Sequence, residues 1–349
     1  MVTGPYGEQQ VLAILVDGRG PARISATASM RSLFPLPRSV TKKSIFFRRS
    51  KGLTVRVFYD NRQTVDGMFS FSPSARKPAL ALESWKRLGI HFTEESFTPL
   101  EIADFVLAHD REYVEGVLSC RLENGYDNRS REFALALPWI AGSMVAAATH
   151  SFSTRELSFS PTSGAHHACY ASGGDYCTFN FLVIAAIKVR QAGARRIGIV
   201  DLDYHYGNGT DDILGRLGLA YIRHYSSGGD PDAKSPNNAE RWLKRLPGIV
   251  RECADVDLII YNAGVDSHNN DPLGGNLTTE QMARRDRIVF EAANEMAIPV
   301  CTSLAGGYQI APDGSLNPVL SLHDTTFISA WEIFEAPEKK EHYEKWNLW

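Results

Sequence analysis

The sequence of 349 residues predicts an α/β protein with a central, mostly parallel sheet that is covered by helices on both faces. Residues 195–203, 256–264 and 298–307 form nearly continuous apolar runs, which are typical of strands buried on both faces. Segments with helical periodicity alternate with these runs, and that order produces parallel strands. No internal repeat or linker divides residues 53–349, so we expect a single domain there.

The individual elements follow from local signals. A helix at residues 179–193 ends at Gly193, a common stop residue, and leads into the strand at 195–203. Thr278 and Gln281 have the spacing of a capping box and mark the start of a later helix. In chain order we expect a strand at 53–60, a helix at 78–90, one or two helices within 102–119, helices at 138–152 and 179–193, strands at 195–203 and 256–264, a helix at 278–297 and a strand at 298–307.

Residues 1–52 are interpreted as a basic extension outside the folded core. No acidic residue occurs between Asp17 and Asp60, whereas ten lysines and arginines fall there. Transit-type leaders are rich in Arg and Ser and poor in acids, so organellar targeting is one interpretation. The other is an upstream segment without a fold of its own, with Met30 as an alternative start.

Charge and cysteine content limit the classes of function. The formal net charge of −3 gives no general reason to expect nucleic-acid binding. The five cysteines are odd in number and contain no CxxC pair, which favours reduced thiols and a cytoplasmic location. We expect no segment that is apolar over the roughly 18 residues of a membrane helix, and therefore no membrane partner. The oligomeric state stays open.

Polar side chains follow the predicted strands. Asp201, Asp203 and His205 recur at period two, so an extended chain points all three to one side. Asp266 follows the next buried strand, and ligands of parallel sheets bind beyond the carboxyl ends of the strands. Asp203, His205 and Asp266 form a three-ligand set that is typical of a catalytic zinc site, and Fe²⁺ or Co²⁺ would also suit it.

Five segments, in this order, resemble the histone deacetylase and acetylpolyamine amidohydrolase superfamily: GAHHA, GGDYCTFNFLVIAA, IGIVDLDYHYGNGT, AGVD followed by DPLG, and LAGGY. The resemblance extends from Val55 to His323 and implies the arginase–deacetylase fold. It also implies hydrolysis of an acetyl or other acyl amide with one Zn²⁺ per chain. The expected substrate is acetyl-lysine, an acetylated polyamine or another small acylated amine.

The resemblance assigns roles to individual residues. His166 and His167 would be the catalytic histidines, and Tyr308 would hydrogen-bond the substrate carbonyl. Asp201 would hold His166, and Asn208 would orient His167. Amide hydrolysis needs an activated water, an oxyanion donor and a proton for the leaving amine, and these residue types supply all three. Asp203, His205 and Asp266 would bind zinc, and Tyr176, Gly307 and Asp127 would contact the substrate.

The sequence departs from the family pattern beside the zinc-binding strand. Many members bind a structural monovalent cation there, with help from a serine on the next strand. Arg223 would replace that cation near Asp201, unless the alignment slips by one or two residues and Ser226 is the true counterpart.

A second departure concerns the substrate channel. Gly228 and Gly229 stand where members often have an aromatic residue opposite Tyr176, which predicts a wider channel. Asp127 has a second interpretation, as a solvated turn residue.

Two other functions are compatible with this fold. An arginase-type ureohydrolase uses a binuclear manganese site, which needs more carboxylates than this pattern offers. A catalytically inactive module that binds acyl-amines would be expected to have lost a zinc ligand, a paired histidine or Tyr308, and all of these are present.

Overall fold

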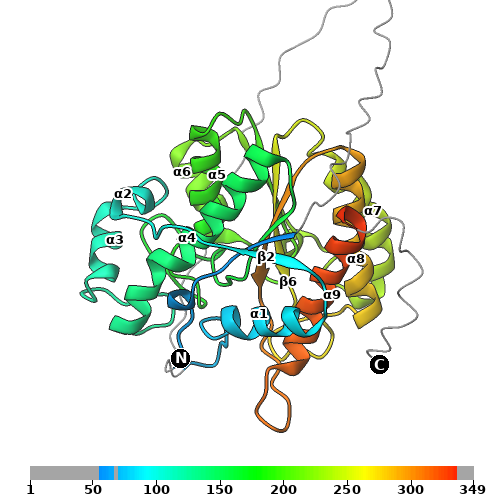
Figure 1. Cartoon of the computed structure of the whole chain (residues 1–349), viewed down its shortest axis with the longest axis horizontal. Coiled ribbons are helices and arrows are strands. Elements are labelled where there is room, and N and C mark those ends of the chain that lie inside the picture. Colours follow the sequence, from blue (N-terminus) through cyan, green and yellow to red (C-terminus); the bar gives the residue numbers. More distant parts are fainter. Residues whose placement is uncertain (1–54, 67–69, 336–349) are drawn as a thin grey trace, which may run out of the picture. The chain divides into compact units, whose positions relative to one another are not determined.

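The computed structural model describes residues 55–66 and 70–335, and the expected extension at residues 1–52 lies outside them. A seven-stranded sheet forms the centre, in the order β2-β1-β3-β7-β6-β4-β5 (Figure 1). Every pairing between these strands is parallel, which confirms the predicted fold class. The strands are β1 (Val55–Phe58), β2 (Phe92–Glu95), β3 (Ser158–Ser160), β4 (Ile197–Asp201), β5 (Ile222–Ser226), β6 (Leu258–Gly264) and β7 (Val300–Ala305).

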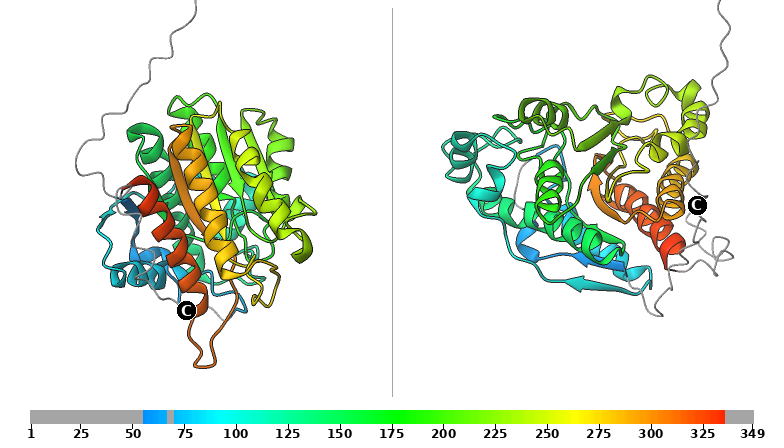
Figure 2. Two further views of the ribbon diagram at one scale, coloured as in Figure 1. Left: turned by 90° about the vertical axis from the view of Figure 1, so that its right-hand side faces the viewer. Right: turned by 90° about the horizontal axis from the view of Figure 1, so that it is seen from above.

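Helices cover both faces of the sheet (Figure 2). One face carries α1 (Lys77–Arg87), α7 (Ala239–Arg251), α8 (Thr279–Glu295) and α9 (Asn317–Phe334). The other carries α4 (Arg131–Thr154), α5 (Phe181–Gln191) and α6 (Asn208–Leu217), with α3 (Arg111–Leu118) beside α4 and α2 (Ile102–Phe105) beside α3. Short 3₁₀ helices lie at Asn61–Gln63, Ser227–Gly229 and Pro236–Asn238.

The apolar runs of the sequence serve two cores at once. Along β6, Ile259 and Tyr261 belong to the core under α7–α9, whereas Leu258 and Ile260 belong to the core under α4–α6. Successive side chains of a strand point to opposite faces, so a strand covered on both faces needs apolar residues at nearly every position. This requirement explains why the central strands could be predicted.

The expected helices and strands are present, and the capping box at α8 is confirmed. Gln281 N donates to the Thr278 hydroxyl at 3.3 Å, and Thr278 N donates to the Gln281 side chain at 3.0 Å. The expectations omitted β2, β3, α6, α7 and α9. The described residues all belong to one compact unit.

Helix α4 corrects the expectation about long apolar segments. Residues 133–154 contain no Asp, Glu, Lys or Arg, and α4 is long and apolar enough to cross a membrane by length and composition alone. In the structure, 67% of its apolar window is buried inside the protein. It packs against α5 and the sheet, as the central helix of a folded core does.

Residues at or near the carboxyl ends of four strands form a polar row across the sheet. The register places Asp201 of β4 between Ser226 of β5 and Asn262 of β6, and places Asn262 beside Ser303 of β7. Ser303 donates its hydroxyl to Asn262 Oδ1 at 3.0 Å, and Asn262 Nδ2 donates to Asp201 Oδ1 at 2.8 Å. The sheet itself therefore fixes the position of the Asp201 carboxylate.

Candidate active site

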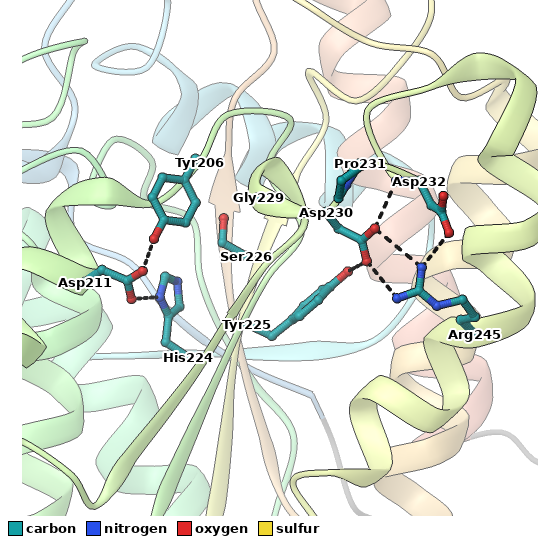
Figure 3. Close-up of a pocket in the computed structure, with 10 residues that line it drawn as sticks. All are labelled: Tyr206, Asp211, His224, Tyr225, Ser226, Gly229, Asp230, Pro231, Asp232 and Arg245. Atoms are coloured by element: carbon teal, nitrogen blue, oxygen red, sulfur yellow. Dashed lines mark hydrogen bonds and ion pairs between the residues drawn. The ribbon is translucent and has the colours of Figure 1, made fainter. Parts of the chain in front are cut away.

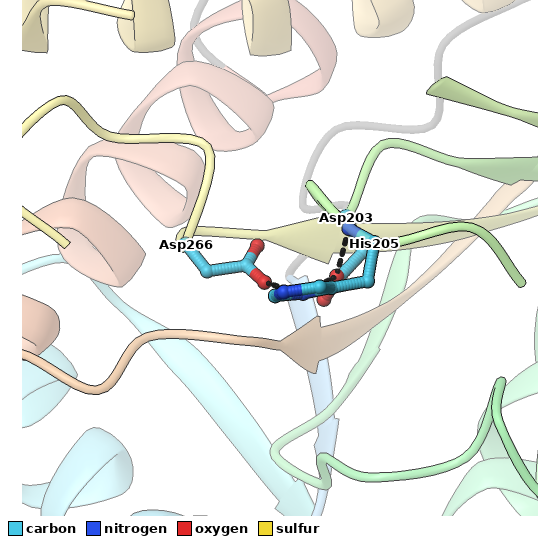
Figure 4. Close-up of side chains that lie close together, drawn as sticks. All are labelled: Asp203, His205 and Asp266. Atoms are coloured by element: carbon cyan, nitrogen blue, oxygen red, sulfur yellow. Dashed lines mark hydrogen bonds and ion pairs between the residues drawn. The ribbon is translucent and has the colours of Figure 1, made fainter. Parts of the chain in front are cut away.

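Three side chains converge just beyond the carboxyl edge of the sheet (Figure 4). Asp203 and His205 lie in the loop after β4, and Asp266 follows β6. One potential ligand atom from each residue lies within 4.8 Å of the others. Both carboxylates are buried, whereas the His205 side chain is 32% exposed. The structure thus brings together the three residues that the sequence suggested as metal ligands.

The hydrogen bonds of His205 suit a metal ligand. Its Nε2 donates to the carbonyl oxygen of Leu273 at 3.1 Å, so Nδ1 is the nitrogen that faces the carboxylates. Nδ1 lies 3.3 Å from Asp203 Oδ1 and 2.9 Å from Asp266 Oδ2. Hydrogen bonds to Asp203 and Asp266 raise the pKa of His205 to about 10. Positive charge is therefore favoured where the three side chains meet.

The two carboxylates supply the complementary negative charge. Burial and the neighbouring Asp203 carboxylate raise the pKa of Asp266 to about 7. Buried carboxylates close to one another are stable when a cation lies between them. Two oxygens and one imidazole nitrogen, with a partly open side, match the donor set of a catalytic zinc site.

His166 contacts a carboxylate on the side away from the pocket. Its Nδ1 donates to Asp201 Oδ2 at 2.7 Å, and its Nε2 lies 3.6 Å from Asp203 Oδ1. Burial disfavours the imidazolium, but Asp201 and Asp203 outweigh burial and raise the pKa of His166 to about 9. His166 is therefore a stable cation at neutral pH.

His167 has a neutral partner in place of a carboxylate. Its Nδ1 donates to Asn208 Oδ1 at 2.6 Å, which leaves the Nε2 lone pair free. Burial and the adjacent positive charge of His166 lower its pKa. The centroids of the two rings lie only 4.0 Å apart. Because their partners differ, His166 favours the charged form and His167 the neutral form.

The sequence YGNGT explains how Asn208 reaches His167. Asn208 is the first residue of α6, and Thr210 N in the same turn donates to the His166 carbonyl at 3.0 Å. A Cβ at Gly209 would lie 2.4 Å from backbone atoms of His167 and Ala168. Only glycine allows the start of α6 to pack this closely on the histidine loop.

Tyr308 and Tyr176 form one wall of the pocket that contains both histidines. Their ring centroids are 5.8 Å apart, and Phe71 stacks on Tyr308 at 6.0 Å. The backbone N–H of Tyr308 donates to Asp271 Oδ2 at 2.8 Å. Burial and the nearby Asp266 raise the pKa of Tyr308 well above its ordinary value, so its hydroxyl is a hydrogen-bond donor.

The glycine pair before Tyr308 has a steric role. A Cβ at Gly306 would lie 2.3 Å from Asp266 Cγ, and Gly306 lines the pocket. A Cβ at Gly307 would meet Val265 at 2.5 Å and Val319 at 2.8 Å. The geometry therefore places Gly306, and not Gly307, in the pocket lining.

Asp127 lies outside the pocket lining. It is exposed at a positive φ of 54°, and its backbone N–H donates to the Asn124 carbonyl at 3.0 Å. The loop that contains Asp127 also contacts Tyr176, because the backbone N–H of Tyr176 donates to the Gly125 carbonyl at 2.8 Å. A substrate contact by Asp127 stays a prediction.

The Arg223 hypothesis is wrong. Its guanidinium points away from Asp201 and donates to the Glu252 carbonyl and to Asp255. Neighbouring residues on a strand point to opposite faces, so the next residue, His224, takes the place near Asp201. The Ser226 hydroxyl accepts a hydrogen bond from Gly207 N at 3.0 Å.

The reason given for a wider channel is wrong, and the wider channel itself stays a prediction. A Cβ at Gly228 would meet the backbone of His205 and Tyr206, and one at Gly229 would meet the Tyr206 ring. Neither glycine lines the pocket beside Tyr176, and that pocket has a volume of only about 10 Å³.

Sequence reasoning missed Lys77, Asn262 and Asp271. Lys77 is fully buried in the first turn of α1 and donates to the Gly306 carbonyl. Burial lowers its pKa to about 8, although Asp266 and Asp203 oppose this shift. The DPLG segment contained the signal for Asp271, but a lysine that opens an amphipathic helix carries no signal that it is buried.

The sequence matches the family profile of the histone deacetylase domain over residues 74–218 and 237–317, more than half of the chain. Histone deacetylase 2 of Arabidopsis thaliana is 30% identical over 42% of this chain, and acetylpolyamine amidohydrolase 2 of Pseudomonas aeruginosa is 28% identical over 43%. These alignments span 42% and 50% of the two relatives' own lengths.

A solved structure shares the fold at low sequence identity. The crystal structure of the HDA15 HD domain superposes with a TM-score of 0.63 at 19% identity. The superposition covers 81% of this chain and 90% of that one. It supports the arginase–deacetylase fold implied by the sequence.

Proposed function

The chain belongs to the histone deacetylase domain family, and on this premise we propose that it is a metal-dependent hydrolase that removes an acetyl group from an amine. The observation that carries the proposal is the pair of neighbouring histidines beside the three-ligand cluster. One histidine is bound to a carboxylate and the other to an amide, which gives a cation and a base side by side.

We propose that Asp203, His205 Nδ1 and Asp266 hold a single Zn²⁺, with Fe²⁺ or Co²⁺ as alternatives. When bound, such an ion lowers the pKa of a water molecule to about 7 and polarises the substrate carbonyl. The Leu273 carbonyl keeps the His205 proton on Nε2 and thereby orients Nδ1 for the ion.

His167 is the proposed general base and then the general acid. Its free Nε2 accepts a proton from the attacking water and returns a proton to the leaving amine. Asn208 fixes the ring by accepting the Nδ1 hydrogen. His166 stays protonated through Asp201 and stabilises negative charge on the substrate oxygen.

Tyr308 is the proposed donor to that oxygen. Its hydroxyl stays protonated, and its ring is held by Phe71 and Tyr176. The pocket beside Tyr176 has a volume of about 10 Å³, room for about one water molecule. The names of the relatives refer to acetylated substrates, so the proposed substrate is an acetylated amine such as acetyl-lysine or an acetylated polyamine.

The family match favours deacetylation over the ureohydrolase alternative. Among the described residues, the one cluster of three potential ligands is Asp203, His205 and Asp266, which suits one ion better than two. An inactive acyl-amine-binding module is the remaining alternative. Hydrolysis of any substrate in the assay described next would exclude it. A cytoplasmic location stays a prediction. It is supported by the five cysteines, none of which is paired in a disulfide among the described residues.

A substrate panel tests the proposal. The purified full chain is assayed on an acetyl-lysine peptide, acetylputrescine, acetylspermidine and longer acyl-lysines, with and without a metal chelator. The His167→Ala variant serves as the inactive control. We expect chelator-sensitive release of acetate from at least one acetylated amine, and release that His167→Ala retains in full would contradict the proposal.

A further inference from the structure

His224 of β5 lies beside the catalytic pair, although no role has been given to it so far. Its side chain is 3% exposed. Nδ1 donates to Asp211 Oδ1 at 2.6 Å, and Nε2 lies 3.9 Å from Asp201 Oδ2. The same Asp201 oxygen accepts the hydrogen bond from His166.

Both ring nitrogens of His224 therefore face carboxylate oxygens. A neutral imidazole carries one N–H and can satisfy only one of these oxygens, whereas an imidazolium carries two. The buried Nε2 has no hydrogen-bond partner among the described residues, and its distance of 3.9 Å from Asp201 Oδ2 allows an ion pair when the ring is protonated.

The steric surroundings keep the ring in this place. A Cβ at Gly207 would lie 2.8 Å from Asp201 Oδ2 and 3.1 Å from the His224 ring. Glycine at this position lets the imidazole approach the carboxylate. Tyr206 donates its hydroxyl to the second oxygen of Asp211 and holds that carboxylate toward His224.

An open cavity of about 600 Å³ adjoins this arrangement (Figure 3). Tyr206, Asp211 and His224 form one side, and a separate ion-pair cluster lies across from them (Figure 3). The charged and titratable groups facing His224 are Asp201 from β4 and Asp211 from α6, with Tyr206 behind Asp211 and, across the cavity, Tyr225, Asp230, Asp232 and Arg245.

We propose that His224 is a positioning residue whose positive charge, held by Asp211, fixes the Asp201 carboxylate for His166. The inference rests on the proposed function and deepens it, because it adds a third histidine to the catalytic pair. Burial opposes the charge on His224, but Asp201 and Asp211 outweigh burial and raise its pKa. Asp201 Oδ2 thus lies between the rings of His166 and His224.

A set of variants tests this role through kinetics. His224→Gln keeps a polar side chain but removes the charge, and Asp211→Asn removes the group that holds it. We expect each to lower kcat about tenfold or more while KM stays within twofold, since positioning groups typically cost 10–100-fold. The double variant should be no worse than either single variant, because both remove one arrangement.

The cavity allows a chemical rescue. In His224→Ala, free imidazole can enter from the cavity and should restore part of kcat, whereas it should not restore Asp211→Asn. The matched control is His150→Gln near the C-terminal end of α4. It removes another histidine–carboxylate pair, in which His150 Nε2 lies 3.0 Å from Glu156 Oε2, and it should leave activity unchanged. His224→Gln activity within twofold of wild type, or losses that multiply in the double variant, would overturn the inference.

A measurement independent of activity separates the two proposals. In protein with ¹⁵N-labelled histidine, NMR should show both ring nitrogens of His224 protonated at pH 7, with the signals assigned by their loss in His224→Gln. A proton on only one nitrogen would overturn the inference even in an active enzyme. If no acetylated amine is hydrolysed, the proposed function fails, and the NMR result still decides the charge of His224.

Discussion

Asn208 Oδ1 lies 2.6 Å from Nδ1 of His167, at the point where His166 has the carboxylate of Asp201. The two histidines are adjacent in sequence but differ in the charge of their partners. The pKa of His166 rises to about 9, and that of His167 falls below its ordinary value. This difference favours the charged form of His166 and the neutral, basic form of His167.

Asn208→Asp should change the pH dependence of the reaction. His167 must be neutral to act as a base, so kcat/KM rises as pH increases through its pKa. A carboxylate at position 208 favours imidazolium and raises that pKa, so the acid limb should move upward by about one pH unit or more. The check is a kcat/KM profile from about pH 5 to about pH 9. An unmoved acid limb would contradict the assignment of His167 as the base.

Tyr308→Phe should remove the proposed oxyanion donor while the ring packing against Phe71 and Tyr176 remains. We expect kcat to fall by about 10²–10³, with little change in KM. Steady-state kinetics provide the measurement. Tyr221→Phe, on the short segment before β5, is the control and should behave as wild type. Equal activity of the two variants would rule out the role of Tyr308.

Gly306→Ala should disturb the metal site directly. The added Cβ would lie 2.3 Å from Asp266 Cγ, at a residue whose φ is +49°. We expect metal affinity to fall about tenfold or more, measured by competition with a coloured chelator. Gly215→Ala in α6 has no atom within 4 Å of the new Cβ, so it should keep metal affinity and raise stability by about 0.5–1 kcal/mol. Unchanged affinity in Gly306→Ala would argue against Asp266 as a ligand.

Lys77→Met should loosen the loop that carries Tyr308. Lys77 is buried and donates to the Gly306 carbonyl, and an unsatisfied buried carbonyl costs about 1–3 kcal/mol. We expect a lower melting temperature and a kcat reduced about tenfold. Lys86→Met removes a half-exposed lysine from the same helix and should change neither. Indistinguishable variants would show that Lys77 does not support the loop.

The candidate metal-ligand set was accessible from sequence because it follows strand geometry, whereas the roles of His166, His167 and Tyr308 came from the family resemblance. Asp201, Asp203 and His205 alternate along one segment, and parallel strands bring Asp266 to the same edge. Such local patterns can be recognised without knowing which distant segments pack together. The same reasoning located the central strands.

The rest depended on contacts that a linear pattern does not record. Lys77 and Gly306 are 229 residues apart, so the burial of this lysine is set by tertiary packing. Strand β3 has three residues, too few for a periodic signal. The sequence analysis weighed Arg223 against Ser226 for the place near Asp201, and the structure puts His224 there; a shift of one residue in register exchanges the two faces of a strand.

The location of the metal tests the central claim most directly. Crystals of the full chain, grown with zinc, are measured on both sides of the zinc absorption edge. We expect one anomalous peak per chain, about 2.0–2.2 Å from oxygens of Asp203 and Asp266 and from Nδ1 of His205. An active enzyme with no peak at this position, or with its peak at other residues, would contradict the claim.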